Sequence, residues 1–85
     1  MKYTYKTKGV CSRSINLEIE NGVVRNVSFE GGCNGNLQGI GQLVEGMKID
    51  DVIERLENIK CGFKNTSCPA QLAEALKMYK AEKGD

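Results

Sequence analysis

The sequence has no histidine and no tryptophan, and it contains a single proline, Pro69, in 85 residues. Without histidine, the commonest general base of enzymes is absent, so hydrolytic chemistry has no obvious base here. The twelve basic and eleven acidic residues nearly cancel, which leaves a net charge of +1. This balance lacks the basic stripe on which nucleic-acid binding depends, and we expect no nucleic-acid partner.

Long apolar runs are missing as well. Residues 1–10 alternate polar and aromatic side chains, and they lack the apolar core of a signal peptide or of a membrane anchor. We therefore expect a cytoplasmic chain with no membrane partner. The length fits one domain, residues 1–85, whose core is small enough that additional cross-linking would help to stabilise it.

Four cysteines are the chemical feature that is present: Cys11, Cys33, Cys61 and Cys68. In a reducing compartment, cysteines are more often metal ligands or reactive thiols than structural disulfides. Their spacing lacks the paired CxxC knuckles of zinc ribbons, so a shared site needs a fold that brings distant segments together. Four thiolates can close a tetrahedral zinc site or hold an iron–sulfur cluster.

The first third of the chain shows the patterns of a small antiparallel sheet. Residues 3–6 and 15–20 alternate in polarity with the period of half-buried strands. Asn21-Gly22 favours a type I′ turn, because both residues tolerate positive φ angles. The partner strand is then expected from Val23 to Phe29, with Val27 and Phe29 on one face.

Two helical patterns follow the sheet. The first helix is expected to end near Gly46, and its apolar positions are Leu37, Ile40, Leu43 and Val44. Asp50 or Asp51 is expected to cap the second helix, which Cys61-Gly62 would close. The apolar stripe of the second helix is predicted to be Val52, Ile53, Leu56 and Ile59.

The third helix is expected to begin at Pro69, with Cys68 as its N-cap and with Leu72, Leu76 and Tyr79 on its apolar face. A helix N-terminus favours an anionic sulfur, so Cys68 is the best candidate for a reactive thiolate. Strands followed by helices predict an α+β domain in which three helices cover one side of the sheet. One end of the sheet and two helix ends are expected to meet near the cysteines.

Residues 29–37 (FEGGCNGNL), 43–46 (LVEG) and 61–73 (CGFKNTSCPAQLA) resemble the small stand-alone proteins of the TSCPD-domain family. The Thr-Ser-Cys-Pro motif and the four cysteines carry the likeness, with Ala70 in place of the family's aspartate. The module also occurs at the C-terminus of cobalamin-dependent ribonucleotide reductases. The resemblance thus implies a role accessory to ribonucleotide reduction. An 85-residue chain has no room for the reductase barrel, so we expect no catalysis by the chain alone.

A second resemblance is to the U-type iron–sulfur cluster scaffolds. Cys11 before the hairpin, Cys33 after a glycine and Cys68 at the last helix match the three scaffold cysteines, and residues 46–50 match the turn between their helices. Arg13 stands where the scaffolds carry an aspartate, and Ser67 where they often carry a histidine. Cys61 is therefore the candidate for a fourth ligand. The resemblance implies a shared architecture.

Three functions remain as alternatives. In the favoured one, Cys11, Cys33, Cys61 and Cys68 bind one zinc ion, or else an iron–sulfur cluster, in a structural site. In the second, the chain is a thiol–disulfide or persulfide carrier in which Cys68 reacts and Cys61 resolves the mixed disulfide. In the third, the cysteines are small buried hydrophobes of a plain interaction domain. A reductase or a sulfur-transfer protein is the expected protein partner.

Overall fold

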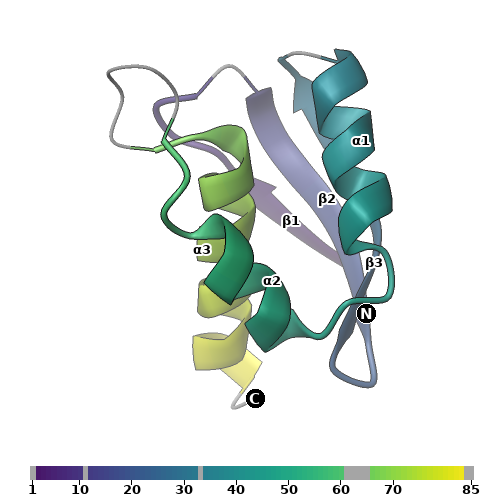
Figure 1. The fold of residues 1–85 in the computed structure, drawn as a ribbon. Coiled ribbons are helices and arrows are strands. Elements are labelled where there is room, and N and C mark those ends of the chain that lie inside the picture. Colours follow the sequence, from purple (N-terminus) through teal and green to yellow (C-terminus); the bar gives the residue numbers. More distant parts are fainter. Residues whose placement is uncertain (1, 11, 33, 61–65, 84–85) are drawn as a thin grey trace.

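The computed structural model describes residues 2–10, 12–32, 34–60 and 66–83, and it confirms the predicted α+β class. One antiparallel sheet has the order β1-β2-β3 and consists of β1 (Lys2–Lys6), β2 (Ser12–Glu20) and β3 (Val23–Gly31). The helices that follow are α1 (Asn34–Val44), α2 (Ile49–Leu56) and α3 (Cys68–Lys83). They lie on one side of the sheet, where α1 packs along β3 and α2 packs against α3 (Figure 1).

The β2–β3 hairpin turns at Asn21-Gly22, as predicted. The two residues have φ angles of 55° and 78°, the left-handed values that a type I′ turn requires. Val27 and Phe29 both pack against the core, which confirms that they share a face. Val24 is fully buried on that face too, although it lies three positions before Val27 and five before Phe29, odd offsets that regular alternation would place on opposite faces. A change of register opposite Asn16 and Glu18 explains this, because a β-bulge shifts the alternation of side chains.

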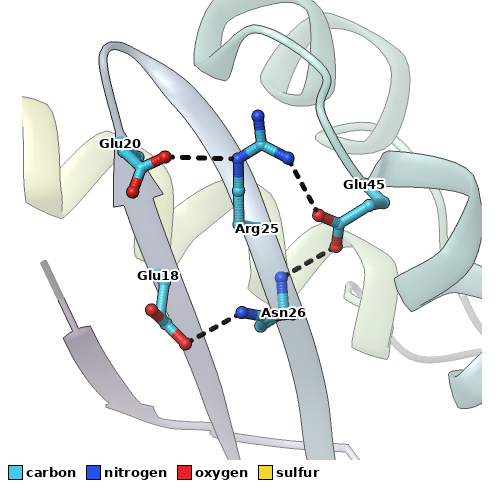
Figure 2. A network of polar contacts seen from close by, with 5 residues as sticks. All are labelled: Glu18, Glu20, Arg25, Asn26 and Glu45. Atoms are coloured by element: carbon cyan, nitrogen blue, oxygen red, sulfur yellow. Dashed lines mark hydrogen bonds and ion pairs between the residues drawn. The ribbon is translucent and has the colours of Figure 1, made fainter.

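Asn26 stands at this bulge and has a φ of 52°. Its backbone N–H donates to Glu45 Oε1 at 2.8 Å, and its side-chain amide donates to Glu18 at 3.0 Å. Arg25 lies between Glu45, at 3.5 Å, and Glu20, at 3.7 Å (Figure 2). These exposed contacts tie the bulge to the end of α1 at the hairpin end of the sheet.

The buried side of α1 differs from the prediction at one position. Leu37 and Val44 are buried and Ile40 is half-buried, but the Leu43 side chain is 78% exposed. Gly41 takes part in the contact instead, since a Cβ added there would lie 2.7 Å from the carbonyl oxygen of Val27. The absence of a side chain lets α1 approach β3 closely, and this approach turns Leu43 towards solvent.

The predicted limits of α2 are also wrong. Its N-cap is Lys48, which makes no side-chain capping bond, while Asp50 and Asp51 lie within the first helical turn. Carboxylates in that position still interact favourably with the helix dipole. The helix ends at Leu56, so it stops well before Cys61, and Ile59 lies beyond the helix and is 41% exposed. Gly46, with a φ of 79°, follows the end of α1 as expected.

The core lies between the sheet and α3. Leu72, Leu76 and Tyr79 are buried, as predicted, against the core side of β2, where Ile15, Leu17 and Ile19 are buried. Tyr79 also meets the ring of Tyr3 edge to face, with 6.0 Å between the ring centroids. None of the helices in the described part of the chain is long and apolar enough to cross a membrane.

Candidate functional site

The N-terminus of α3 carries the one cysteine that the described residues include. Here the structure corrects the predicted cap. Ser67 is the N-cap, because its Oγ accepts the N–H of Ala70 at 3.1 Å and its carbonyl accepts the N–H of Gln71 at 2.8 Å. Cys68 is therefore the first residue of the helix and Pro69 the second. A serine oxygen accepts hydrogen bonds better than sulfur does, which explains why the cap lies one residue earlier.

The Cys68 side chain points into the protein and is only 7% exposed. Its Sγ lies 3.1 Å from the Oγ of Ser12, which is buried at the start of β2. Either atom can donate in this pair. A hydroxyl that donates to sulfur would stabilise a thiolate, because hydrogen bonds to an ionised group are among the stronger ones. Thr7 holds the backbone around Ser12, since its hydroxyl donates to the Ser12 carbonyl.

Other connecting segments reach the same end of the molecule. Ser12 pairs in register with Gly31, the last residue of β3. Gly31 and Gly32 have φ angles of 81° and 79°, a backbone that glycine adopts without strain and that turns the chain away from β3. On the other side, the Ser67 hydroxyl donates to the carbonyl of Ile59 at 2.6 Å. The ends of β2 and β3 and the segment after α2 thus meet at the start of α3.

Gln71 adds a polar contact one turn into α3. Its Oε1 accepts the backbone N–H of Lys8 at 3.0 Å, and its Nε2 donates to the Thr66 hydroxyl at 3.1 Å. Ser12, Ser67 and Gln71 are the buried polar residues of the described ranges. Sequence reasoning assigned a role to none of them. Only Ser67 carried a usable local signal, as a serine shortly before a proline at a helix start.

The predicted metal ligands Cys11, Cys33 and Cys61 lie outside the described residues, so their association with Cys68 stays a prediction. Within the described ranges no group of three or more cysteine, aspartate, glutamate or histidine side chains could hold a metal ion. Cys68 is the one predicted ligand that the described residues include, and its buried side chain has the Ser12 hydroxyl at hydrogen-bonding distance.

Ionisable groups elsewhere carry modest perturbations. Hydrogen bonds from Ser14 and Asn16 hold the pKa of the Glu30 carboxyl below its ordinary value, on the sheet face that the helices leave uncovered. Burial raises the pKa of Tyr3 and of Tyr5. Glu30, Tyr3 and Tyr5 do not form a pair of acid and base that face a common point. These three groups therefore offer no arrangement for proton-transfer catalysis.

A groove of about 680 Å³ runs between β3 and α1. Its walls are largely amide and hydroxyl side chains together with glycine, including Asn26, Ser28, Gln38 and Gln42. These groups can form hydrogen bonds, and Glu45 adds a carboxylate to the wall, but the lining includes no soft metal ligand. The chemistry that the described residues offer is therefore concentrated at the start of α3.

The comparison with protein families gives one result. The model of the TSCPD domain matches residues 1–80, which include all three strands and nearly all of the three helices. No curated protein and no solved structure gave a match. The matched range contains Ser12, Ser67 and Gln71 as well as Cys68, so the candidate site at the start of α3 lies within the matched domain. The chain belongs to the TSCPD-domain family.

Proposed function

We propose that this chain is a small metal-binding module in which Cys11, Cys33, Cys61 and Cys68 bind one zinc ion. The observation that carries the proposal is the convergence of four chain segments at the start of α3. Each segment leads to one of the four cysteines. Four thiolates suit zinc, which binds sulfur at about 2.3 Å in tetrahedral sites.

Two of the segments meet through a side-chain contact. Cys11 is bonded to Ser12, whose Oγ lies 3.1 Å from Cys68 Sγ. Consecutive Cα atoms in a chain are about 3.8 Å apart, so Cys11 is one residue from a direct contact of the Cys68 sulfur. This contact between Ser12 and Cys68 supports the proposal that the first and the last cysteines of the sequence share an ion.

The other two segments arrive through backbone contacts. Gly31 is the register partner of Ser12, and Cys33 follows it by two residues. Ile59 accepts the hydrogen bond from the Ser67 side chain, and Cys61 follows it by two residues. These short separations, at about 3.8 Å per residue, support the proposal that both cysteines join Cys68 in one site.

Zinc would supply cross-linking that a core of this size lacks. Structural zinc sites stabilise small domains by about 10 kcal/mol or more, because the site does not exist in the unfolded chain. An iron–sulfur cluster on the same thiolates is the alternative occupant. In either case the residues of the chain act as ligands, and we assign them no catalytic role.

One observation favours a second function, a plain interaction domain with buried cysteines. Cys68 is 7% exposed, as expected of a cysteine that acts as a small hydrophobe. The same burial disfavours the remaining alternative, a thiol–disulfide or persulfide carrier that uses Cys68 and Cys61, because an attacking thiol must be accessible. The interaction domain differs from the metal module in needing none of its thiols ionised.

The proposal also includes a role in the cell. We place the module in the cytoplasm, as an accessory to ribonucleotide reduction or to the handling of clusters and sulfur. Its protein partner would be a reductase or a sulfur-transfer protein. The support for this role is the relation of the family to reductase modules.

Metal content tests the proposal. The protein should be purified without chelator and without a metal-affinity step, then analysed for zinc and iron and for thiols that react before and after chelation. We expect about one zinc or its iron equivalent per chain, with thiols that become reactive only after chelation. Each Cys→Ser variant should lose the metal, and Ser28→Cys, which adds an exposed thiol on β3, should not raise the metal content. A metal-free protein with reactive thiols would contradict the proposal.

A further inference from the structure

Gln71 is a polar side chain in a part of α3 that is otherwise apolar and buried. Its neighbours Ala70 and Leu72 are buried, and Gln71 itself is only 7% exposed. Its amide is used at both ends, as the acceptor of the Lys8 N–H and as the donor to the Thr66 hydroxyl. A buried amide that bonds two separate segments fixes where both of them lie.

The two segments are the connections that lead into the proposed site. Lys8 belongs to the link between β1 and β2, just before Ser12, and it lies 63 positions away from Gln71 in sequence. Thr66 directly precedes the N-cap Ser67. The segments also lie close together, since a Cβ added at Gly9 would lie 3.7 Å from the Thr66 methyl group. One side chain therefore fastens the β1–β2 link and the approach to α3 together.

We propose that Gln71 is a positioning residue of the thiolate site. It holds the β1–β2 link and the segment before α3 in the arrangement that brings ligands to one ion. The inference rests on the proposed metal-binding function and deepens it, because it names a residue that sets the geometry without touching the metal. Gln71 acts through its bonds to the backbone of Lys8 and to the side chain of Thr66.

Gln71→Met removes one partner of each bond and leaves the Lys8 N–H and the Thr66 hydroxyl without it. Such a loss lowers stability whatever the role of the residue, so a positioning role must be read from metal affinity relative to stability. A methionine at position 71 would retain much of the volume and would suit a helix. What methionine cannot do is hold Lys8 and Thr66 in place. A positioning role therefore predicts a loss of metal affinity that is larger than the loss of metal-free stability explains.

The test compares Gln71→Met with Gln42→Met, which makes the same chemical change at an exposed position of α1. Zinc affinity is measured by competition with a chromogenic chelator, and Lys8 amide exchange is followed by NMR in the metal-free protein. In Gln71→Met we expect roughly a 10- to 100-fold loss of zinc affinity, with faster Lys8 exchange and a loss of metal-free stability too small to account for the change in affinity. Gln42→Met should behave as the parent protein does.

Thr66→Val provides a milder variant in case Gln71→Met does not fold. Valine keeps the methyl group that faces Gly9 and removes only the hydroxyl that Gln71 bonds. Loss of this one bond should weaken zinc binding by roughly 2- to 10-fold. In the Gln71→Met background the same change should have no further effect, because the partner of the hydroxyl is already gone.

The outcomes separate the two proposals. If the parent binds one zinc and both Gln71→Met and Thr66→Val bind it equally tightly, the positioning role is wrong and the metal module stands. If the variants lose affinity only in proportion to metal-free stability, Gln71 is a structural residue and the inference is again overturned. If the parent binds no metal, the proposed function fails, and the positioning of a metal site fails with it.

Discussion

The helices α1 and α3 pack against the same sheet in different ways. Of the described residues of α1, only Leu37, Gly41 and Val44 are buried, and the contact with β3 depends on the close approach at Gly41. In α3 most positions of the first three turns are buried, among them Leu72 and Leu76 at no exposure. The residue that anchors the candidate site, Cys68, lies on the helix that is more deeply buried.

This difference indicates how stability is distributed. Regions with few buried apolar contacts open locally at a lower free energy than the core does. We expect α1 to tolerate changes on its outer side, and α3 to transmit most changes to the whole fold. Paired variants in the two helices test this contrast.

The largest effect is expected from Leu76→Ala in α3. This change creates a cavity in the core and should lower the free energy of unfolding by about 2–5 kcal/mol. Leu43→Ala in α1, at a side chain that is mostly exposed, should change it by less than about 0.5 kcal/mol. Urea denaturation of the metal-free protein measures both. Comparable losses for the two leucines would remove the contrast between the helices.

Gly41→Ala tests the close approach of α1 to β3. The new methyl group would lie 2.7 Å from a backbone oxygen that cannot rotate away, and such overpacking costs about 1–3 kcal/mol. The gain in helix propensity, about 1 kcal/mol, offsets part of this cost. We expect a net loss of stability in a urea titration.

Gly39→Ala is the matched control, because a Cβ at position 39 meets nothing within 4 Å. It should stabilise the protein by up to about 1 kcal/mol, through helix propensity alone. If both alanine variants were more stable than the parent protein, the close approach of Gly41 to the Val27 carbonyl oxygen would be contradicted.

Ser67→Ala removes the cap of α3. Loss of an N-cap serine costs about 1 kcal/mol, and the carbonyl of Ile59 also loses its donor. Ser28→Ala at an exposed position of β3 is the control, with an expected change within about 0.5 kcal/mol. Thermal unfolding followed by circular dichroism suffices for the comparison. An unchanged melting temperature in Ser67→Ala would show that the hydroxyl is not the functional cap.

The smallest effect is expected on the uncovered face of the sheet. The pKa of Glu30 is lowered by hydrogen bonds from Ser14 and Asn16, so folding favours its carboxylate form. The contribution of this group to stability is complete above the ordinary pKa of 4.5 and is lost as the pH falls through the lower, folded-state pKa. Ser14→Ala should move the pKa back towards 4.5 in an NMR titration, whereas Ser28→Ala should not.

Local patterns predicted most of the secondary structure. The period-2 alternation identified the strands, and Asn21-Gly22 identified the turn, because both signals depend on neighbouring residues only. The buried positions Leu72, Leu76 and Tyr79 of α3 were predicted in the same way. The errors arose at Leu43 and at the ends of α2 and α3. Burial at Leu43 depends on the angle at which α1 meets β3, and the caps depend on which oxygen reaches an N–H group.

The candidate site likewise combines features that local sequence predicts with contacts that only the fold creates. The sequence alone determined the α+β order, the four-cysteine composition and the placement of Cys68 at a helix start, since these follow from local periodicity and from the motif. Only the tertiary structure decided that Ser12 meets Cys68 and that Gln71 holds Lys8, across 56 and 63 positions of the chain. Such contacts depend on sheet register and on helix docking, which are set by how the whole core packs rather than by any local pattern.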